Sequence, residues 1–269
     1  MCETCGCGEP GGYTVGIPGG QAHDPTHDHM HPGGHSHTHS HGSDEHTHFH
    51  EHATEKVLDV NKDILFENNL IAERNRGFFE GRKIFCINLV SSPGSGKTTL
   101  LEKTIIALKR KVGISVIEGD QQSFLDAERI EKTGVPVVQI NTGMGCHLDA
   151  RMVNSALQKL VIAEQSILFI ENVGNLVCPA IFDLGETRRV LVMSVTEGDD
   201  KPLKYPAMFR SASLCILNKT DLLPYVSFNV DIAIRNALAI NPSLEFIKLS
   251  ATTGEGMHEW LDYCTNLIQ

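Results

Sequence analysis

The segment at residues 91–99 constrains the fold of this chain more than any other. It reads Ser-Ser-Pro-Gly-Ser-Gly-Lys-Thr-Thr, follows an apolar run at 84–90, and a helical pattern starts at its lysine. Glycines let backbone N–H groups curl around a phosphate, and the N-terminus of the following helix adds a favourable dipole. A chance Gly/Ser turn is the alternative, but the strand–loop–helix context favours a phosphate-binding loop.

Within this loop, Lys97 would reach the β- and γ-phosphates of a nucleoside triphosphate, and the Thr98 hydroxyl would hold Mg²⁺. Ser91 stands where the usual pattern has its first glycine, which weakens the pattern more than the mechanism. Lys97 is also a predicted catalytic residue. The predicted nucleotide-binding residues of the loop are Gly94, Ser95, Gly96, Lys97, Thr98 and Thr99.

Short apolar, β-branched runs alternate with longer helical patterns from residue 84 onward, after an amphipathic helix predicted over 56–80. This alternation predicts an α/β fold, a P-loop NTPase with a mostly parallel sheet covered by helices on both faces. Ligands in such folds bind at the carboxyl ends of the strands. The predicted strands are 84–90, 115–118, 136–140, 167–171, 190–195, 214–218 and 245–249, and the predicted helices are 97–111, 124–133, 147–163, 202–210, 229–240 and 256–267.

The sequence Asn218-Lys219-Thr220-Asp221 follows one of these strands and indicates which base is bound. A carboxylate there can accept hydrogen bonds from guanine N1–H and N2–H₂, whereas adenine has no matching pair of donors. Alone, such a motif is usually an exposed turn. After a phosphate loop, and with Ser250-Ala251 at a later strand end, it favours GTP. The predicted base-site residues are Asn218, Lys219, Asp221, Ser250 and Ala251.

Two other strand ends are acidic. Glu118-Gly119-Asp120 ends one strand and Glu171-Asn172-Val173-Gly174 ends another, and both fit positions that hold Mg²⁺ or place the attacking water. The second departs from the usual Asp-x-x-Gly because it begins with Glu171. Helix caps and turns are the alternative interpretation. We predict Asp120 and Glu171 as catalytic residues.

Cys146, His147 and Cys178 form a candidate metal site. The first two lie between a predicted strand and helix, and Cys178 follows Gly174 by four residues. Two thiolates and one imidazole suit Zn²⁺ or Ni²⁺. Three ligands leave such a site incomplete, which invites a second subunit or an exchangeable ligand. Core cysteines with a capping histidine, or a Cys–His nucleophile pair, are the alternatives.

The first 55 residues differ in composition from the rest. They hold eight acidic residues, no lysine or arginine, and 12 of the 14 histidines, and their apolar residues are few and unpatterned. We therefore predict a disordered metal-binding tail at 1–55 and a GTPase domain at 56–269.

Cys2, Cys5 and Cys7 open this tail, close enough together to hold one metal ion. A redox Cys-x-x-Cys would follow a strand, so metal binding is the better interpretation. The tract at 23–52 is dominated by His-x-His repeats, which bind divalent metals. A purification tag or a solvated spacer is the alternative for the tract.

Composition excludes several other classes. The net charge of −10 argues against nucleic-acid binding, and no run approaches the about 18–20 apolar residues of a membrane span. Because no secretory signal is present, a cytoplasmic location and reduced cysteines are expected. Cys86, Cys215, Cys264, His258 and Trp260 are expected to pack in the core.

Together, the motifs at 91–99, 118–122, 145–150, 171–179 and 218–221 resemble HypB, the nickel-inserting GTPase family of [NiFe]-hydrogenase maturation. The resemblance covers essentially all of 56–269, and Cys2-Glu3-Thr4-Cys5-Gly6-Cys7 matches the family's nickel motif. It implies a SIMIBI-class fold, a homodimer on GTP binding, a HypA-type partner, and nickel delivery to the hydrogenase large-subunit precursor. It also implies that Cys146, His147 and Cys178 bind Ni²⁺ or Zn²⁺.

The first hypothesis is therefore a GTP-hydrolysing nickel metallochaperone whose histidine tract stores nickel. The second is a metal-storage protein with a secondary nucleotide domain. A third, a P-loop kinase of a small metabolite, is opposed by the guanine motif and by the metal ligands beside it.

Overall fold

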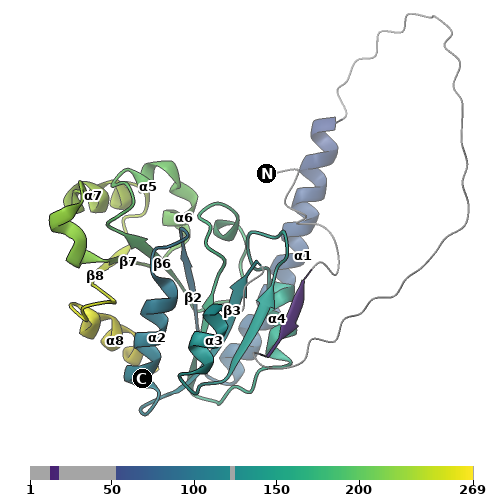
Figure 1. Cartoon of the computed structure of the whole chain (residues 1–269). Helices are drawn as coiled ribbons and strands as arrows, with labels where there is room; N and C mark the ends of the chain where they lie inside the picture. The colour runs from purple at the N-terminus through teal and green to yellow at the C-terminus, as the bar shows by residue number, and fades with distance from the viewer. Residues whose placement is uncertain (1–12, 18–52, 122–124, 269) are drawn as a thin grey trace, which may run out of the picture.

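The computed structural model describes residues 13–17, 53–121 and 125–268. Its strands form one sheet with the order β1-β4-β3-β5-β2-β6-β7-β8 (Figure 1). Neighbouring strands are parallel except for β1, which pairs antiparallel with β4, so the predicted mostly parallel sheet is confirmed. The strands are β1 (Thr14–Gly16), β2 (Phe85–Ser91), β3 (Gly113–Asp120), β4 (Val137–Asn141), β5 (Ser166–Glu171), β6 (Arg188–Ser194), β7 (Leu214–Asn218) and β8 (Glu245–Lys248).

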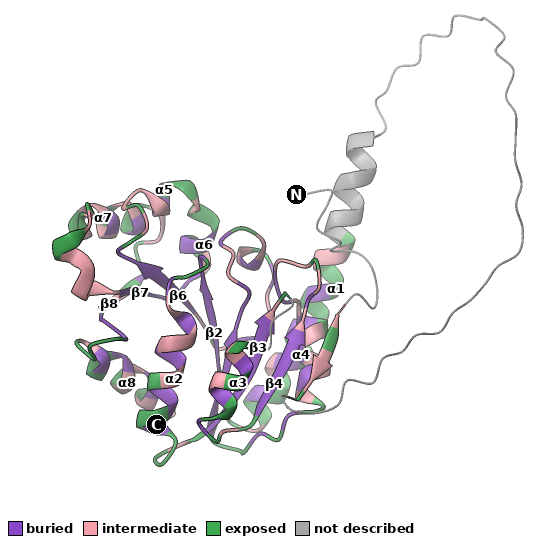
Figure 2. Cartoon of the chain, viewed as in Figure 1, coloured by how far each residue is buried: buried purple, intermediate pink, exposed green. Residues whose placement is uncertain are grey.

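Helices cover both faces of this sheet, as predicted. Alternating residues of β2 show why: Ile87 and Leu89 face one cluster of buried side chains, and Cys86 faces another. Buried residues of α2, α3 and α8 belong to the first cluster, and buried residues of α1 and α4 belong to the second. Figure 2 shows the buried parts of these elements. The α-helices are α1 (Ala53–Gly81), α2 (Lys97–Leu108), α3 (Leu125–Glu131), α4 (Ala150–Leu157), α5 (Lys201–Lys204), α6 (Pro206–Ser211), α7 (Val230–Ile240) and α8 (Met257–Asn266), and the 3₁₀ helices are η1 (Cys178–Ala180) and η2 (Thr220–Tyr225).

Two predicted helices differ from the observed ones. The helix expected from 147 starts at Ala150, because the Asp149 side chain accepts a 2.7 Å hydrogen bond from the Met152 N–H and caps it. The helix expected at 202–210 is split into α5 and α6. Tyr205 has φ −127° and ψ 52°, outside the helical region, because the following Pro206 disfavours helical geometry before it.

One segment of the predicted tail belongs to the sheet. Residues 14–16 form β1 at its edge, the Tyr13 hydroxyl lies 2.9 Å from Ser155 Oγ, and Lys159 Nζ donates a 2.8 Å hydrogen bond to the Val15 carbonyl. For residues 13–17 the prediction of disorder was therefore wrong. The short run Tyr13-Thr14-Val15 shows only weak alternation of apolar and polar residues. It forms a strand because β4 offers an edge with which it can pair.

The expected core residues are buried, with one exception. Cys86, Cys215, Cys264 and Trp260 are each 0% exposed, and the Trp260 indole N–H donates a 2.8 Å hydrogen bond to Thr104 Oγ1. His258 lies exposed on α8, because the helix turns its 257, 260 and 264 face to the core.

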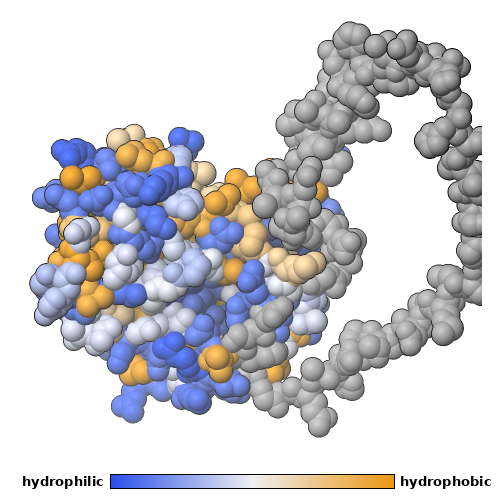
Figure 3. Space-filling model, turned by 45° about the horizontal axis from the view of Figure 1, so that its top comes forward, coloured by the Kyte–Doolittle hydropathy of each residue, from blue (hydrophilic) through white to orange (hydrophobic). Residues whose placement is uncertain are grey.

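Apolar and hydrophilic residues are interspersed over the face seen in Figure 3. Among the described residues, no helix combines the length and the apolar character that crossing a bilayer requires.

Candidate nucleotide and metal sites

The phosphate loop lies between the carboxyl end of β2 and the first turn of α2. Gly94 and Gly96 have φ of 73° and 98°, and a Cβ on Gly96 would lie 2.6 Å from Asn218 Nδ2, so this position requires glycine. Lys97 Nζ donates a 2.8 Å hydrogen bond to Ser91 Oγ. The residue that replaces the usual first glycine therefore positions the lysine.

A cavity of about 530 Å³ opens over this loop, large enough for a nucleotide phosphate chain. It brings together predicted residues from the carboxyl ends of β2, β3, β5 and β7. Asp126, Ala127 and Arg129 of α3, which are not among the predicted site residues, also line it. The predicted residues along its wall are Gly94, Ser95, Gly96, Lys97, Thr98, Thr99, Asp120, Glu171 and Lys219.

Two buried carboxylates face each other in this cavity. Register pairs Glu118 of β3 with Glu171 of β5, and the two side chains are 2% and 5% exposed. Burial, and then repulsion by Glu171, raise the pKa of Glu118 well above its usual range. Burial also raises the pKa of Glu171, although the Lys97 ammonium and the Thr98 hydroxyl oppose the shift.

These residues fit a Mg²⁺ ion. The Thr98 hydroxyl donates a 2.7 Å hydrogen bond to Glu171 Oε1, while Glu118 Oε1 and Glu171 Oε2 are buried without a hydrogen-bond partner. Hard oxygen ligands around a site with excess negative charge are what Mg²⁺ binds, and the ion would offset the repulsion. Thr98, Glu118 and Glu171 would hold it directly or through water.

Asp120 lies two residues further along β3, half-buried at the cavity wall, and its Oδ1 accepts a 2.6 Å hydrogen bond from the Gln121 N–H. Asp120, not Glu118, is the predicted functional acid of this strand end. The strand register would have favoured Glu118, because it places that residue directly beside Glu171.

The predicted base site is linked to the phosphate loop by hydrogen bonds. Asn218 Nδ2 donates to the Ser95 carbonyl at 2.9 Å, and its Oδ1 accepts from the Lys219 and Ala251 N–H groups at 2.8 and 3.1 Å. Lys219 Nζ donates to the Gly94 carbonyl at 2.7 Å.

Ser250 is 0% exposed, and Asp221 Oδ1 is buried without a hydrogen-bond partner. Asn218, Asp221, Ser250 and Ala251 do not line the phosphate cavity themselves. An unpaired carboxylate oxygen on Asp221 is nevertheless the acceptor that a guanine base needs.

The structure brings the predicted metal ligands of the domain together. Potential ligand atoms of Cys146, His147 and Cys178 lie within 4.8 Å of one another. The two Sγ atoms are 3.0 Å apart, longer than the about 2.05 Å of a disulfide, so both residues keep their thiols. Two soft thiols and an imidazole within reach of one ion match the preferences of Zn²⁺ and Ni²⁺.

The histidine of this cluster is held in a form suited to metal binding. His147 is 5% exposed, and its ring packs against that of Phe182 with centroids 4.1 Å apart and the planes tilted by 31°. Burial lowers the pKa of His147, and nearby Asp149 only partly opposes the shift. The neutral imidazole, which is the ligand form, is therefore favoured.

The other predicted metal ligands, Cys2, Cys5, Cys7 and the histidine tract at 23–52, lie outside the described residues.

Comparison with known proteins identifies the family of this site. The model of the CobW/HypB/UreG nucleotide-binding domain matches residues 85–248. The chain is 59% identical over 208 residues to the hydrogenase maturation factor HypB of Escherichia coli K12, which covers 77% of this chain and 72% of that protein. It is 45% identical to the probable HypB of Methanocaldococcus jannaschii, over 79% of this chain and 96% of that one.

Solved structures agree with the sequence comparisons. HypB from Archaeoglobus fulgidus superposes with a TM-score of 0.70 at 40% identity, covering 76% of this chain and 99% of that one. HypB from Helicobacter pylori in complex with nickel gives 0.71 at 34% identity, covering 75% and 95%. The resemblance drawn from the motifs is confirmed, and the chain belongs to the HypB family of hydrogenase maturation factors, whose P-loop domain is a GTPase.

Proposed function

We propose that this protein is a nickel metallochaperone that couples GTP hydrolysis to the release of nickel into the hydrogenase large-subunit precursor. One observation carries the proposal: Cys178 lies seven residues after Glu171, so a ligand of the metal cluster and a carboxylate of the phosphate cavity share one short segment. Nickel in the similar H. pylori structure supports the choice of metal.

Each residue of the nucleotide site has a role in this proposal. Lys97 neutralises charge on the transferred phosphoryl group, and Asp120 at the cavity wall orients the attacking water. Thr98, Glu118 and Glu171 would hold Mg²⁺, which would supply positive charge to offset that of the phosphates. Asp221 selects guanine, and Asn218 holds the base loop to the phosphate loop through the Ser95 carbonyl.

We further propose that the protein forms a homodimer when GTP is bound. The three-ligand metal site is incomplete for one chain. Exposed apolar side chains stand beside its ligands: Met144 is 78%, Val177 61% and Ile181 42% exposed. A second copy would cover these side chains and could complete the coordination shell of the ion.

Other partners and roles follow from the family. A HypA-type chaperone would exchange nickel with this protein, and Cys2, Cys5 and Cys7 would supply a second, N-terminal nickel site. The histidine tract would store nickel. A cytoplasmic location agrees with Cys146 and Cys178 being outside any disulfide.

The central test is nickel binding by the full chain with Cys2, Cys5 and Cys7 changed to Ser, measured with GDP and with a non-hydrolysable GTP analogue. An affinity that differs by about fivefold or more between the two nucleotides supports coupling. Equal affinities in both states would exclude it.

A storage protein with a secondary nucleotide domain is the competing function, favoured by the density of histidines at 23–52. Deleting that tract separates the two. Bulk nickel capacity should fall while hydrogenase maturation continues. Failure of maturation at ample nickel would instead make the tract part of delivery.

A further inference from the structure

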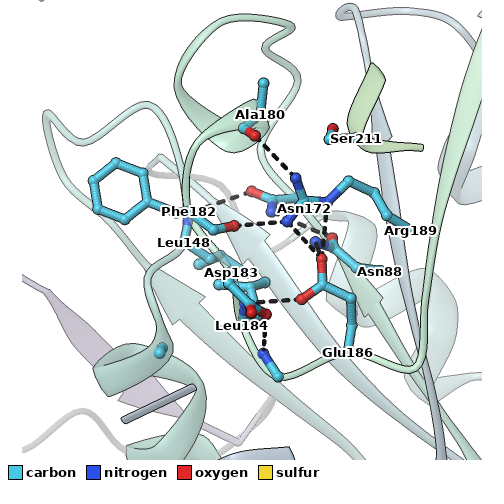
Figure 4. A network of polar contacts seen from close by, with 12 residues as sticks. Asn88, Leu148, Asn172, Ala180, Phe182, Asp183, Leu184, Glu186, Arg189 and Ser211 are labelled. Carbon is cyan, nitrogen blue, oxygen red and sulfur yellow. Dashed lines mark hydrogen bonds and ion pairs between the residues drawn. The ribbon is translucent and has the colours of Figure 1, made fainter. Parts of the chain in front are cut away.

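Asn172 lines the nucleotide cavity and hydrogen-bonds to Leu148, the chain neighbour of the metal ligand His147. It follows Glu171 at the end of β5 and is 1% exposed. Its Oδ1 accepts a 3.2 Å hydrogen bond from the Leu148 N–H, and its Nδ2 donates to Asn88 Oδ1 at 3.3 Å (Figure 4). One buried amide therefore starts two branches of hydrogen bonds, one through Leu148 and one through Asn88.

The first branch leads to His147. Leu148 is its chain neighbour, and the Leu148 side chain packs so closely on β3 that a Cβ added to Gly119 would lie 2.7 Å from it. Gly119 separates Glu118 from Asp120 on the cavity edge. The position of the Leu148 backbone, and with it the imidazole, thus depends on Asn172 and on the acidic end of β3.

The second branch leads to the segment that carries Cys178. Asn88 Nδ2 donates a 3.0 Å hydrogen bond to Glu186 Oε1, which also accepts from Arg189 Nε at 2.8 Å. Arg189 in turn donates to the Ala180 and Phe182 carbonyls at 3.1 and 2.7 Å.

The side chains of this second branch are buried, and both carboxylate oxygens of Glu186 accept hydrogen bonds. Side chains of Glu186 and Arg189 are only 6% and 10% exposed, and the Leu184 N–H satisfies the second Glu186 oxygen at 2.8 Å. Breaking one member of such a pair is costly, so the group should move as a unit. It fixes the backbone on both sides of Ile181, just after Cys178.

The two branches meet again at the metal cluster. Arg189 donates to the Phe182 backbone carbonyl, and the Phe182 ring packs against the His147 ring. Asn175, three residues after Asn172, donates a 3.3 Å hydrogen bond from Nδ2 to the Cys146 carbonyl. All three metal ligands therefore contact, or neighbour residues that contact, the segment that starts at Glu171.

We propose that Asn172 is the positioning residue that transmits nucleotide state to the metal ligands, with Asn88, Glu186 and Arg189 as the buried relay to Cys178. The inference rests on the proposed coupling and names the residues responsible for it. When the γ-phosphate is gained or lost, Glu171 shifts and moves the adjacent Asn172. The residues of both hydrogen-bonded branches then move with Asn172.

The test uses the full chain with Cys2, Cys5 and Cys7 changed to Ser, in three further variants. Asn172→Ala removes both branches. Asn172→Asp keeps the acceptor for the Leu148 N–H but loses the donor to Asn88. Asn241→Ala is the control, because it too removes an asparagine amide that makes two hydrogen bonds, here from Nδ2 to the Phe209 and Ala212 carbonyls, far along the chain from the metal ligands.

Nickel affinity is measured for each variant with GDP and with the GTP analogue, and nucleotide affinity with and without nickel. A wild-type coupling of about 5- to 150-fold should fall to within about twofold of unity in Asn172→Ala and partly in Asn172→Asp, and should persist in Asn241→Ala. Linkage requires the effect of nickel on nucleotide affinity to fall by the same factor. A purely structural role would change affinity equally in both nucleotide states.

The two levels of the hypothesis fail differently. If the wild type shows no dependence on nucleotide, the proposed coupling and this inference are both wrong. If the wild type shows it and Asn172→Ala retains it, only the role of Asn172 is wrong. Should Asn172→Ala not fold, full coupling in Asn172→Asp overturns the proposal on its own.

Discussion

The Thr98 hydroxyl donates a 2.7 Å hydrogen bond to Glu171 Oε1, joining the first turn of α2 to the end of β5. Glu118 lies beside this pair with its own carboxylate buried. Without a cation, burial and mutual repulsion disfavour the charged forms of Glu118 and Glu171. Such a site trades stability for the ability to bind an ion.

Glu118→Gln should therefore stabilise the protein in the absence of Mg²⁺ and nucleotide, by about 1–2 kcal/mol at pH 8, while weakening Mg²⁺ binding. Thermal unfolding in chelator and Mg²⁺ titration with nucleotide measure the two effects. The exposed Glu131→Gln serves as the control. A variant less stable than the wild type would contradict the assignment.

The same carboxyl predicts a pH dependence. Because the pKa of Glu118 is raised on folding, the folded state holds a proton that the unfolded state releases above its ordinary pKa of 4.5. Stability of the metal-free protein is thus lost as pH rises above that value. The advantage of Glu118→Gln should be absent near pH 4 and grow toward pH 8. An advantage that shrinks with rising pH would show that another group is responsible.

Lys97→Ala should reduce GTP hydrolysis by about a hundredfold or more, because the ammonium that would neutralise the phosphates is lost. Phosphate release at saturating GTP measures it. Lys103→Ala, exposed on the same helix, should retain activity. Turnover retained in Lys97→Ala would overturn the phosphate-loop assignment.

Asp221→Asn should lower the preference for GTP over ATP by about ten- to a hundredfold, since the buried acceptor for guanine N–H groups becomes partly a donor. Competition of each nucleotide against a fluorescent GTP analogue reports the ratio. Asp262→Asn, an exposed change on α8, is the comparison. An unchanged ratio excludes Asp221 from base selection.

Cys178→Ser should weaken nickel binding more than about a hundredfold when Cys2, Cys5 and Cys7 are also Ser, because loss of a ligand exceeds the 10–100-fold effect of outer partners. The thiolate-to-nickel absorption should fall with it. Cys264→Ala removes a thiol that is buried on α8 and should leave both signals intact. Retained absorption in Cys178→Ser would remove this residue from the ligand set.

Much of the fold was predictable because local and global signals agree. The seven predicted strands occur within a few residues of their expected bounds, since each is an apolar β-branched run. Lys97 and Thr98 stand at the start of α2 because the glycine pattern specifies the turn. Cys146, His147 and Cys178 meet because the carboxyl ends of β4 and β5 share an edge.

What the sequence could not show depends on contacts between distant segments. Glu118 takes its place beside Glu171 through strand register, which no local pattern reveals. Asn172 resembled part of a turn, and its importance lies in bonds to Leu148 and to Asn88. Glu186 and Arg189 are of residue types that are mostly exposed, and no local pattern indicates that they form a buried pair.

The edge strand β1 changes how this protein should be shortened for experiments. It precedes the histidine tract in the chain, so both ends of residues 18–52 join one domain. Starting the chain at residue 56 would strip β4 of its neighbour and leave unpaired N–H and C=O groups open to strand addition from another molecule. Self-association of such a shortened protein could then be mistaken for dimerisation driven by GTP, whereas excising only 23–52 keeps that edge closed.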